Sequence, residues 1–151
     1  MKDILDLIIN GLDMIATASI AYIAYRFSKK SSTQQALNTL KESVKEIDFN
    51  LAQRFRPDEN MGLELIRAED EKDKNRTSWE IIYFLNEYEA IASGVNHGLL
   101  DEKVVKTARK DALIQAYKIY KPFIDDWREK YPQNPPAWAE LERLETKWNK
   151  K

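Results

Sequence analysis

The sequence predicts an all-α protein with an N-terminal transmembrane helix, a heptad-patterned stalk helix and a compact antiparallel helical bundle. Three observations lead to this fold class. One long apolar run lies near the N-terminus, apolar residues elsewhere recur every three or four positions, and no stretch alternates as a β-strand does. The domain organisation that follows is a transmembrane anchor over 1–30, juxtamembrane stalk helices with a charged linker over 31–76, and a helical bundle domain over 77–151.

The apolar run extends from Ile4 to Phe27. As a helix it would be about 36 Å long at ~1.5 Å per residue, which is enough to span a bilayer core of roughly 30 Å. Arg26, Lys29 and Lys30 come at its end, so the positive-inside rule places the C-terminal side in the cytoplasm. A cleavable signal peptide would carry its charged region first, and here the basic cluster comes last. We therefore expect a single-pass protein of the inner (cytoplasmic) membrane, with membrane lipid as one partner.

Polar and small residues within this run share one helical face, because their spacing alternates between four and three positions. The face contains Asp6, Asn10, Asp13, Thr17 and Ala21. A carboxylate at mid-bilayer costs about 2.5 to 3.5 kcal/mol, so such groups avoid lipid. One interpretation is a packing seam against a second copy or a partner helix, and a sharper one is an ion path. A third interpretation is an imperfect anchor with a protonated or hydrated Asp13, and a fourth is an interfacial helix, which the missing basic face disfavours.

The segment after the anchor carries a heptad seam. It consists of Leu37, Leu40, Val44, Ile47 and Leu51. Two structures would use this seam: a parallel coiled coil between copies, giving a homo-oligomer, or packing within the chain on the C-terminal helices. Pro57 is expected to end this helix, because the residue before a proline avoids helical geometry. A shorter helix is expected from Asp58 to Asp70, and the charged run from Glu69 to Arg76 is interpreted as a solvated linker.

The first helix of the bundle is predicted from a capping box at Thr77 and Glu80, and it is expected to end at His97 and Gly98. Its apolar stripe is Ile81, Leu85, Tyr88, Ala92 and Val95, widened by Trp79, Phe84 and Ile91. The breadth of this stripe predicts burial against more than one neighbour.

Two further helices complete the predicted bundle. Asp101 caps the first of them, and Pro122 predicts a kink or a one-turn break near Tyr120. Its apolar side is Val105, Ala108, Ala112, Ala116, Ile119, Phe123 and Trp127. The last helix is expected to open at Pro135, the tolerated first position. Its apolar edge is Trp138, Leu141, Leu144 and Trp148.

Three segments of this region carry a family resemblance: LNEYEAIASGVNHGLLDEKVVK, IYKPFIDDWREKYP and WAELERLETKW. Over residues 79–148 the chain resembles an uncharacterised bacterial and phage family, labelled only as a domain of unknown function. In that family a membrane-spanning helix precedes a small helical domain. The resemblance implies this architecture and a loose association with membrane-linked or phage-related roles. It implies no catalytic residue.

The sequence contains no recognisable set of catalytic, cofactor-binding or metal-binding residues. It has no cysteine, and His97 is its single histidine, interpreted as a helix-end residue. Glu87 and Glu89 cannot share a helical face, and Glu142 and Glu145 are interpreted as members of surface ion pairs. The 24 basic and 25 acidic residues give no basic excess for nucleic acid. Four tryptophans could line an aromatic groove, although such spacing is more typical of a core: Trp79, Trp127, Trp138 and Trp148.

These observations predict a membrane-anchored protein–protein interaction module that is not an enzyme and needs no cofactor. Its protein partner is not identified by the sequence. A phage or prophage role, such as superinfection exclusion or interference with a host membrane process, fits the small size and the family resemblance. A second hypothesis is an oligomeric membrane effector that forms a pore or ion path through the N-terminal helix. A third is an enzyme domain tethered to the membrane.

Overall fold

The computed structural model describes the backbone of residues 2–54, 63–74, 76–132 and 135–150, and the side chains of the same residues except 2–16, 46–54 and 73. This part contains five helices and no strand, so the predicted all-α class is confirmed. The helices are α1 (Lys2–Arg54), α2 (Leu63–Asp73), α3 (Arg76–Asn96), α4 (Glu102–Lys130) and α5 (Ala139–Asn149).

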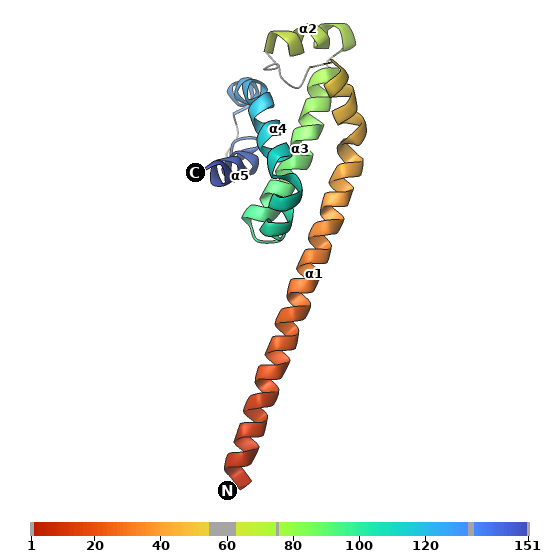
Figure 1. The fold of residues 1–151 in the computed structure, drawn as a ribbon. Helices are drawn as coiled ribbons and strands as arrows, with labels where there is room; N and C mark the ends of the chain where they lie inside the picture. Colours follow the sequence, from red (N-terminus) through yellow and green to blue (C-terminus); the bar gives the residue numbers. More distant parts are fainter. Residues whose placement is uncertain (1, 55–62, 75, 133–134, 151) are drawn as a thin grey trace.

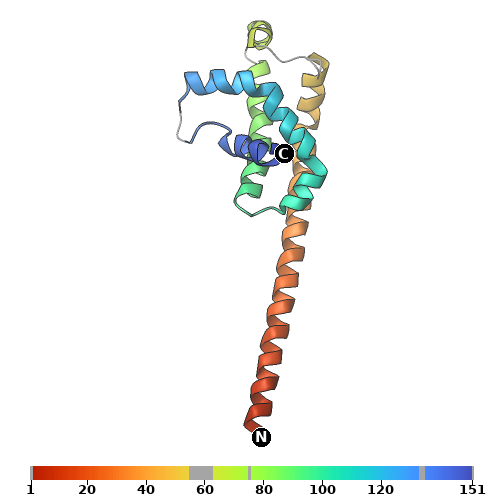
Figure 2. The same ribbon diagram turned by 60° about the vertical axis from the view of Figure 1, so that its left-hand side comes forward.

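Helix α3 is the centre of the bundle and contacts each of the other four helices. Helices α1 and α4 both run antiparallel to it (Figures 1 and 2). Helix α5 packs on α3 and α4 on the side away from α1, and α2 lies across the end where α3 begins (Figure 1). The core therefore forms where three long helices meet, with two short helices covering it.

Helix α1 has two parts with different surroundings. Its C-terminal half contacts α3 and α4, and there the seam residues Leu37, Leu40 and Val44 are buried. Its N-terminal half projects away from the bundle, and no other described helix lies beside it (Figures 1 and 2). These three seam residues therefore pack within the chain, and a coiled coil between copies does not describe them. The side chains of Ile47 and Leu51 lie outside the described residues.

The charged run from Glu69 to Arg76 is not the predicted linker. Helix α2 spans Leu63–Asp73, so most of the run is helical. The predicted start at Asp58 lies outside the described residues. The carboxylate of Asp70 accepts hydrogen bonds from the backbone N–H and the hydroxyl of Ser78, near the start of α3. The carboxylate of Asp70 thus joins the charged segment of α2 to the start of α3.

The connection from α3 to α4 follows the local signals of the sequence. Gly98 has a φ of 72°, the left-handed geometry that favours glycine, and its N–H donates to the carbonyl of Val95. Asp101 then caps α4 by accepting the N–H groups of Lys103 and Val104. Both predicted helix boundaries are confirmed.

Four details of the bundle differ from the prediction. Trp79 and Ala108 are exposed, because α3 and α4 turn other faces to their neighbours. Helix α5 begins after Trp138, whose φ of 56° makes a left-handed turn, rather than at Pro135. Of the two predicted alternatives at Pro122, a kink or a one-turn break, the break is wrong, because α4 is continuous through this residue. The helix changes direction along its length, in agreement with the kink alternative (Figure 2).

The buried face of α4 is broader than the predicted stripe. Only Val105, Ala116 and Phe123 of that stripe are buried. The other buried residues are Leu113, Ile114, Tyr117, Tyr120 and Ile124. Helix α4 packs against α1, α3 and α5, so it needs a wide apolar surface.

Candidate functional site: the projecting helix and an aromatic groove

The projecting part of α1 exposes several large apolar side chains within eight successive residues, whereas the bundle exposes them singly. Ile20, Ile23 and Phe27 are 68%, 66% and 75% exposed. Tyr22 and Tyr25 are exposed as well, so apolar and aromatic groups occur around the whole helix rather than on one face. A helix that is apolar all round is typically covered by protein or lipid.

The predicted membrane seam lies on this same part of α1. Thr17 and Ala21 are exposed and contact no other element of the described chain. The side chains of Asp6, Asn10 and Asp13 lie outside the described residues, so the seam stays a prediction. Among the residues that the structure describes, no helical segment is both long and apolar enough to cross a bilayer.

A groove of about 610 Å³ opens between α2, the start of α3 and the end of α4. Ile66, Ile82 and Phe123 form part of its apolar lining, and Trp79 and Trp127 supply aromatic surface. The volume falls within the range of roughly 300 to 1,000 Å³ that is typical of ligand sites. The groove is large enough to take a side chain or a small molecule.

The four tryptophans of the predicted aromatic groove divide into two kinds. Trp79, which is 65% exposed, and the half-buried Trp127 line the groove. Trp138 is buried beside Trp127, with ring centroids 6.1 Å apart, and its indole N–H donates to Asn86. Trp148 is buried elsewhere and donates to Glu102. The structure therefore brings two of the four to the groove and uses the other two as core.

Charged side chains form one edge of the groove. Arg67 of α2 and Lys130 of α4 both pair with Asp126, at 2.9 and 2.8 Å. The hydrogen bond from Lys130, followed by that from Arg67, holds the pKa of Asp126 below its usual value. This cluster fixes α2 against α4, and it leaves the groove with polar groups of both signs.

A polar network that sequence reasoning missed fixes α5 on the bundle. Glu89 of α3 accepts the backbone N–H groups of Glu140 and Leu141, at 3.0 and 2.7 Å. Asn96 donates to the carbonyl and the carboxylate of Glu140. Burial raises the pKa of Glu89, and these two N–H donors oppose the rise. The partners lie far apart in sequence, so no local pattern could have revealed them.

Glu142 belongs to a second network rather than to the surface pairs expected on its own helix. It accepts the hydroxyl of Tyr117 at 2.7 Å and pairs with Arg128 at 3.0 Å. The Tyr117 hydrogen bond lowers the pKa of Glu142, whereas burial, followed by that carboxylate, raises the pKa of Tyr117 well above its ordinary value. Arg143 pairs instead with Glu140. Both networks bind α5 to the bundle, which indicates a structural role.

The remaining candidate, His97, lies just past the end of α3, as predicted. It is exposed, and its Nδ1 lies 2.9 Å from the carbonyl of Ser93. In the described part of the chain, no group of three or more histidine, aspartate or glutamate residues could hold a metal ion. The structure therefore offers two candidate binding surfaces: the groove between α2, α3 and α4, and the projecting half of α1.

Comparison with known proteins adds a family but no function. No curated protein and no solved structure matches the chain. One family model, described as "Domain of unknown function (DUF4760)", matches residues 8–148. The match confirms the expectation of an uncharacterised family, and it extends over most of α1. The bacterial or phage origin stays a prediction.

Proposed function

Since the chain belongs to the DUF4760 family, whose function is unknown, we propose its role from the geometry: a membrane-attached module for contact with another protein. In this proposal the N-terminal part of α1 lies in the bilayer and the bundle stands on the cytoplasmic side. The observation that carries it is the exposure of Ile20, Ile23 and Phe27 on the projecting half of α1, which no other described helix covers.

The bilayer is favoured as the cover because of what borders the exposed segment. The run from Met14 to Tyr25 contains no charge, and Arg26, Lys29 and Lys30 follow it. Tyr22 and Tyr25 lie at this boundary, where amphipathic rings favour the membrane interface. The rest of the apolar run continues toward the N-terminus of the same helix.

The proposed partner contact uses the groove between α2, α3 and α4. Exposed aromatic residues are enriched at protein interfaces, and Trp79 at 65% exposure is of this kind. The apolar lining would receive an apolar side chain of the partner, while Arg67 and Asp126 offer polar contacts at the edge. A phage or prophage role fits this proposal but remains a prediction from the family resemblance.

The test of membrane attachment is a double substitution in the full chain, Ile20→Lys with Ile23→Lys. The two lysines place charge within the apolar run near its cytoplasmic end, where each costs less than the ~3 kcal/mol of a lysine at mid-bilayer depth, so the variant should be extracted from the membrane fraction at alkaline pH to a greater extent than the wild type. The matched control is Leu65→Lys with Tyr83→Lys, two exposed apolar residues of the bundle. A wild-type chain that purifies without lipid or detergent as a soluble oligomer would overturn the proposal in favour of self-association.

A labelling experiment locates the covered segment. The chain has no cysteine, so each introduced cysteine reports its own surroundings. Cysteine at Ala16 or Ala18 should be protected from a membrane-impermeant maleimide, and cysteine at Lys41 should react once the membrane is permeabilised to give the maleimide access to the cytoplasmic side. Equal reaction at all three positions would contradict burial of α1 in lipid.

A further inference from the structure

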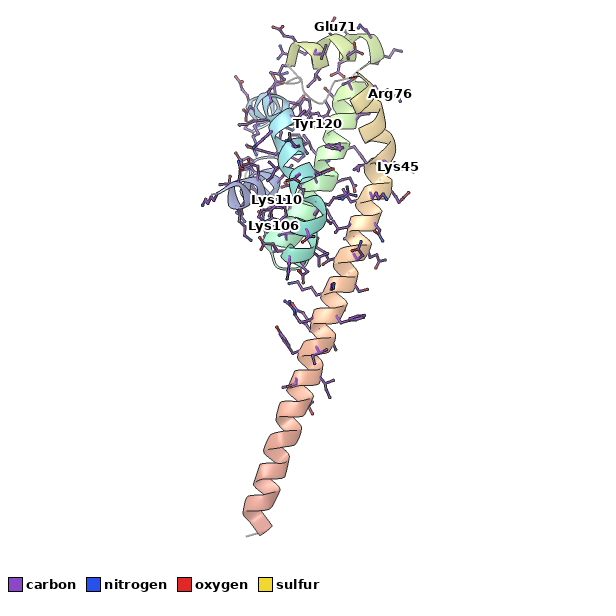
Figure 3. All side chains as sticks on the ribbon, in the orientation of Figure 1. Lys45, Glu71, Arg76, Lys106, Lys110 and Tyr120 are labelled. Atoms are coloured by element: carbon purple, nitrogen blue, oxygen red, sulfur yellow. The ribbon has the colours of Figure 1, made fainter. Side chains whose placement is uncertain are left out.

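A second cleft lies where α1 leaves the bundle. It has a volume of about 510 Å³ and is formed by α1 on one side and by the α3–α4 turn with the start of α4 on the other. Four basic side chains line it: Arg26 and Lys29 from α1, and Lys103 and Lys106 from α4. Figure 3 places Lys106 toward the end of the bundle from which the projecting helix extends.

The basic side chains in this cleft carry more charge than its carboxylates neutralise. None of the four basic residues forms an ion pair with another residue that the structure describes. The two carboxylates in the cleft are already engaged: Asp101 accepts N–H groups at the start of α4, and Glu102 accepts Lys147 and Trp148. The Lys147 hydrogen bond, first of several causes, lowers the pKa of Glu102, so this group stays ionised and occupied. The cleft therefore offers positive charge although the whole chain has a net charge of −1.

The two walls of the cleft are held in register by a buried hydroxyl. Thr33 of α1 is fully buried, donates to the carbonyl of Lys29 at 2.7 Å and accepts the N–H of Asp101 at 2.8 Å. This bridge joins the α1 wall directly to the N-cap of α4. The four basic side chains are consequently presented by a fixed backbone rather than by independent segments.

The position of the cleft indicates its ligand. Arg26 directly follows the exposed apolar segment, and Leu99, in the turn beside the cleft, is 72% exposed. An exposed leucine next to a group of basic side chains is the combination that suits a membrane surface, where the apolar group enters the interface and the cations meet phosphate.

We propose that this cleft binds the phosphate headgroup of an anionic lipid in the leaflet from which α1 emerges. The inference rests on the proposed membrane attachment of α1 and specifies which lipid the bundle contacts. Lysine and arginine are hydrogen-bond donors without acceptors, which suits a phosphodiester with its acceptor oxygens. Bound lipid would hold the bundle close to the surface.

The test uses the full chain with a donor fluorophore on cysteine introduced at Ala108, an exposed position of α4 near the cleft. The protein is reconstituted into phosphatidylcholine vesicles that contain a rising fraction of acceptor-labelled phosphatidylglycerol, with acceptor-labelled phosphatidylcholine as the neutral probe. We expect stronger transfer to the anionic lipid. In the variant K103Q/K106Q the lipid fraction at half-saturation should rise about 25-fold, since each basic group near an anionic surface contributes roughly fivefold.

The matched control removes two positive charges elsewhere. Lys41 and Lys45 are exposed on α1, and Figure 3 shows Lys45 farther from the projecting end than Lys106. Lys41 lies about 18 Å along the helix from Lys29 at ~1.5 Å per residue, beyond the screening length of about 10 Å. K41Q/K45Q should therefore change half-saturation less than twofold. An equal shift in both variants, or equal transfer to both lipids in the wild type, would overturn the proposal.

Two further measurements distinguish lipid binding from competing explanations. Inorganic phosphate that displaces the anionic lipid at constant ionic strength would assign the cleft to a soluble anion and overturn the lipid assignment. Flotation with pure phosphatidylcholine vesicles tests the anchor independently, because a neutral bilayer offers nothing to the lysines. Flotation without a preference for phosphatidylglycerol would remove the cleft proposal and leave the anchor in place.

Discussion

Glu89 provides a helix cap that the sequence next to α5 lacks. The N-cap position of α5 is Trp138, whose side chain makes no capping hydrogen bond. The first backbone N–H groups of a helix have no partner within it, and here the carboxylate of Glu89 accepts two of them from α3. A residue on one helix therefore completes the start of another.

We expect Glu89→Ala to lower the free energy of unfolding by about 1–3 kcal/mol, because two buried N–H groups lose their acceptor. Urea denaturation followed by circular dichroism measures the change. Glu87→Ala is the control on the same helix and should change stability by no more than about 0.5 kcal/mol. Equal losses in the two variants would show that the cap contributes nothing specific.

At the scale of elements, the attachment of α5 depends on ionised carboxylates. The pKa values of Glu102 and Glu142 are lowered in the folded chain, by Lys147 and by Tyr117 respectively as the largest causes. A lowered folded pKa stabilises the fold above the ordinary carboxyl value of 4.5, and the contribution is lost as the pH falls through the folded value. Glu89 has the opposite sign, because its raised pKa makes its ionised form a cost of folding at neutral pH.

We therefore expect the melting temperature to decrease at pH values below about 4.5, and we expect α5 to be among the first elements that lose their structure. The measurement is thermal unfolding between pH 7 and pH 3 for the wild type and for Glu102→Gln. The variant should be less stable at pH 7 and should show a weaker dependence on pH. An identical slope in both proteins would mean that Glu102 does not contribute to the acid sensitivity.

The sequence predicted those elements whose signals are local. The stripe of α3, the left-handed turn at Gly98 and the cap at Asp101 each depend on residues a few positions apart, and each is confirmed. The buried residues Leu141, Leu144 and Trp148 of α5 also follow helical spacing.

The errors arise where distant residues decide the structure. The run expected as a linker is mostly helical, and its Asp70 accepts hydrogen bonds from Ser78, eight positions away. The left-handed Trp138 precedes α5, which begins beyond Pro135. The exposure of Trp79 depends on which face of α3 meets α2, which spacing alone does not determine. The groove could be suggested by its tryptophans, but its limits are set by the packing of three helices.

At the scale of the whole molecule, α1 joins the exposed apolar segment to the core without interruption. Inserting seven helix-forming residues after Phe27 should move the bundle about 10 Å farther from the exposed apolar segment along the axis of α1. The insertion should rotate the bundle about that axis by only about 20°. Energy transfer from a donor at Ala108→Cys to a neutral acceptor lipid in vesicles would measure the displacement. The melting temperature should stay unchanged, because the insertion touches no packed residue. An unchanged distance would contradict a continuous helix.

The bridge from Thr33 to Asp101 has a mechanical consequence. Since α1 enters the core as one helix and is fastened there by a buried hydroxyl, the direction of its projecting half fixes the direction of the bundle. In the proposed membrane-attached state, a tilt of the N-terminal half of α1 that bilayer thickness imposes would also tilt the bundle. The groove near α2 lies at the far end of the molecule, so the same tilt would displace it over a longer distance. The thickness of the membrane and the orientation of the groove toward a partner protein would then be coupled through the continuous helix α1.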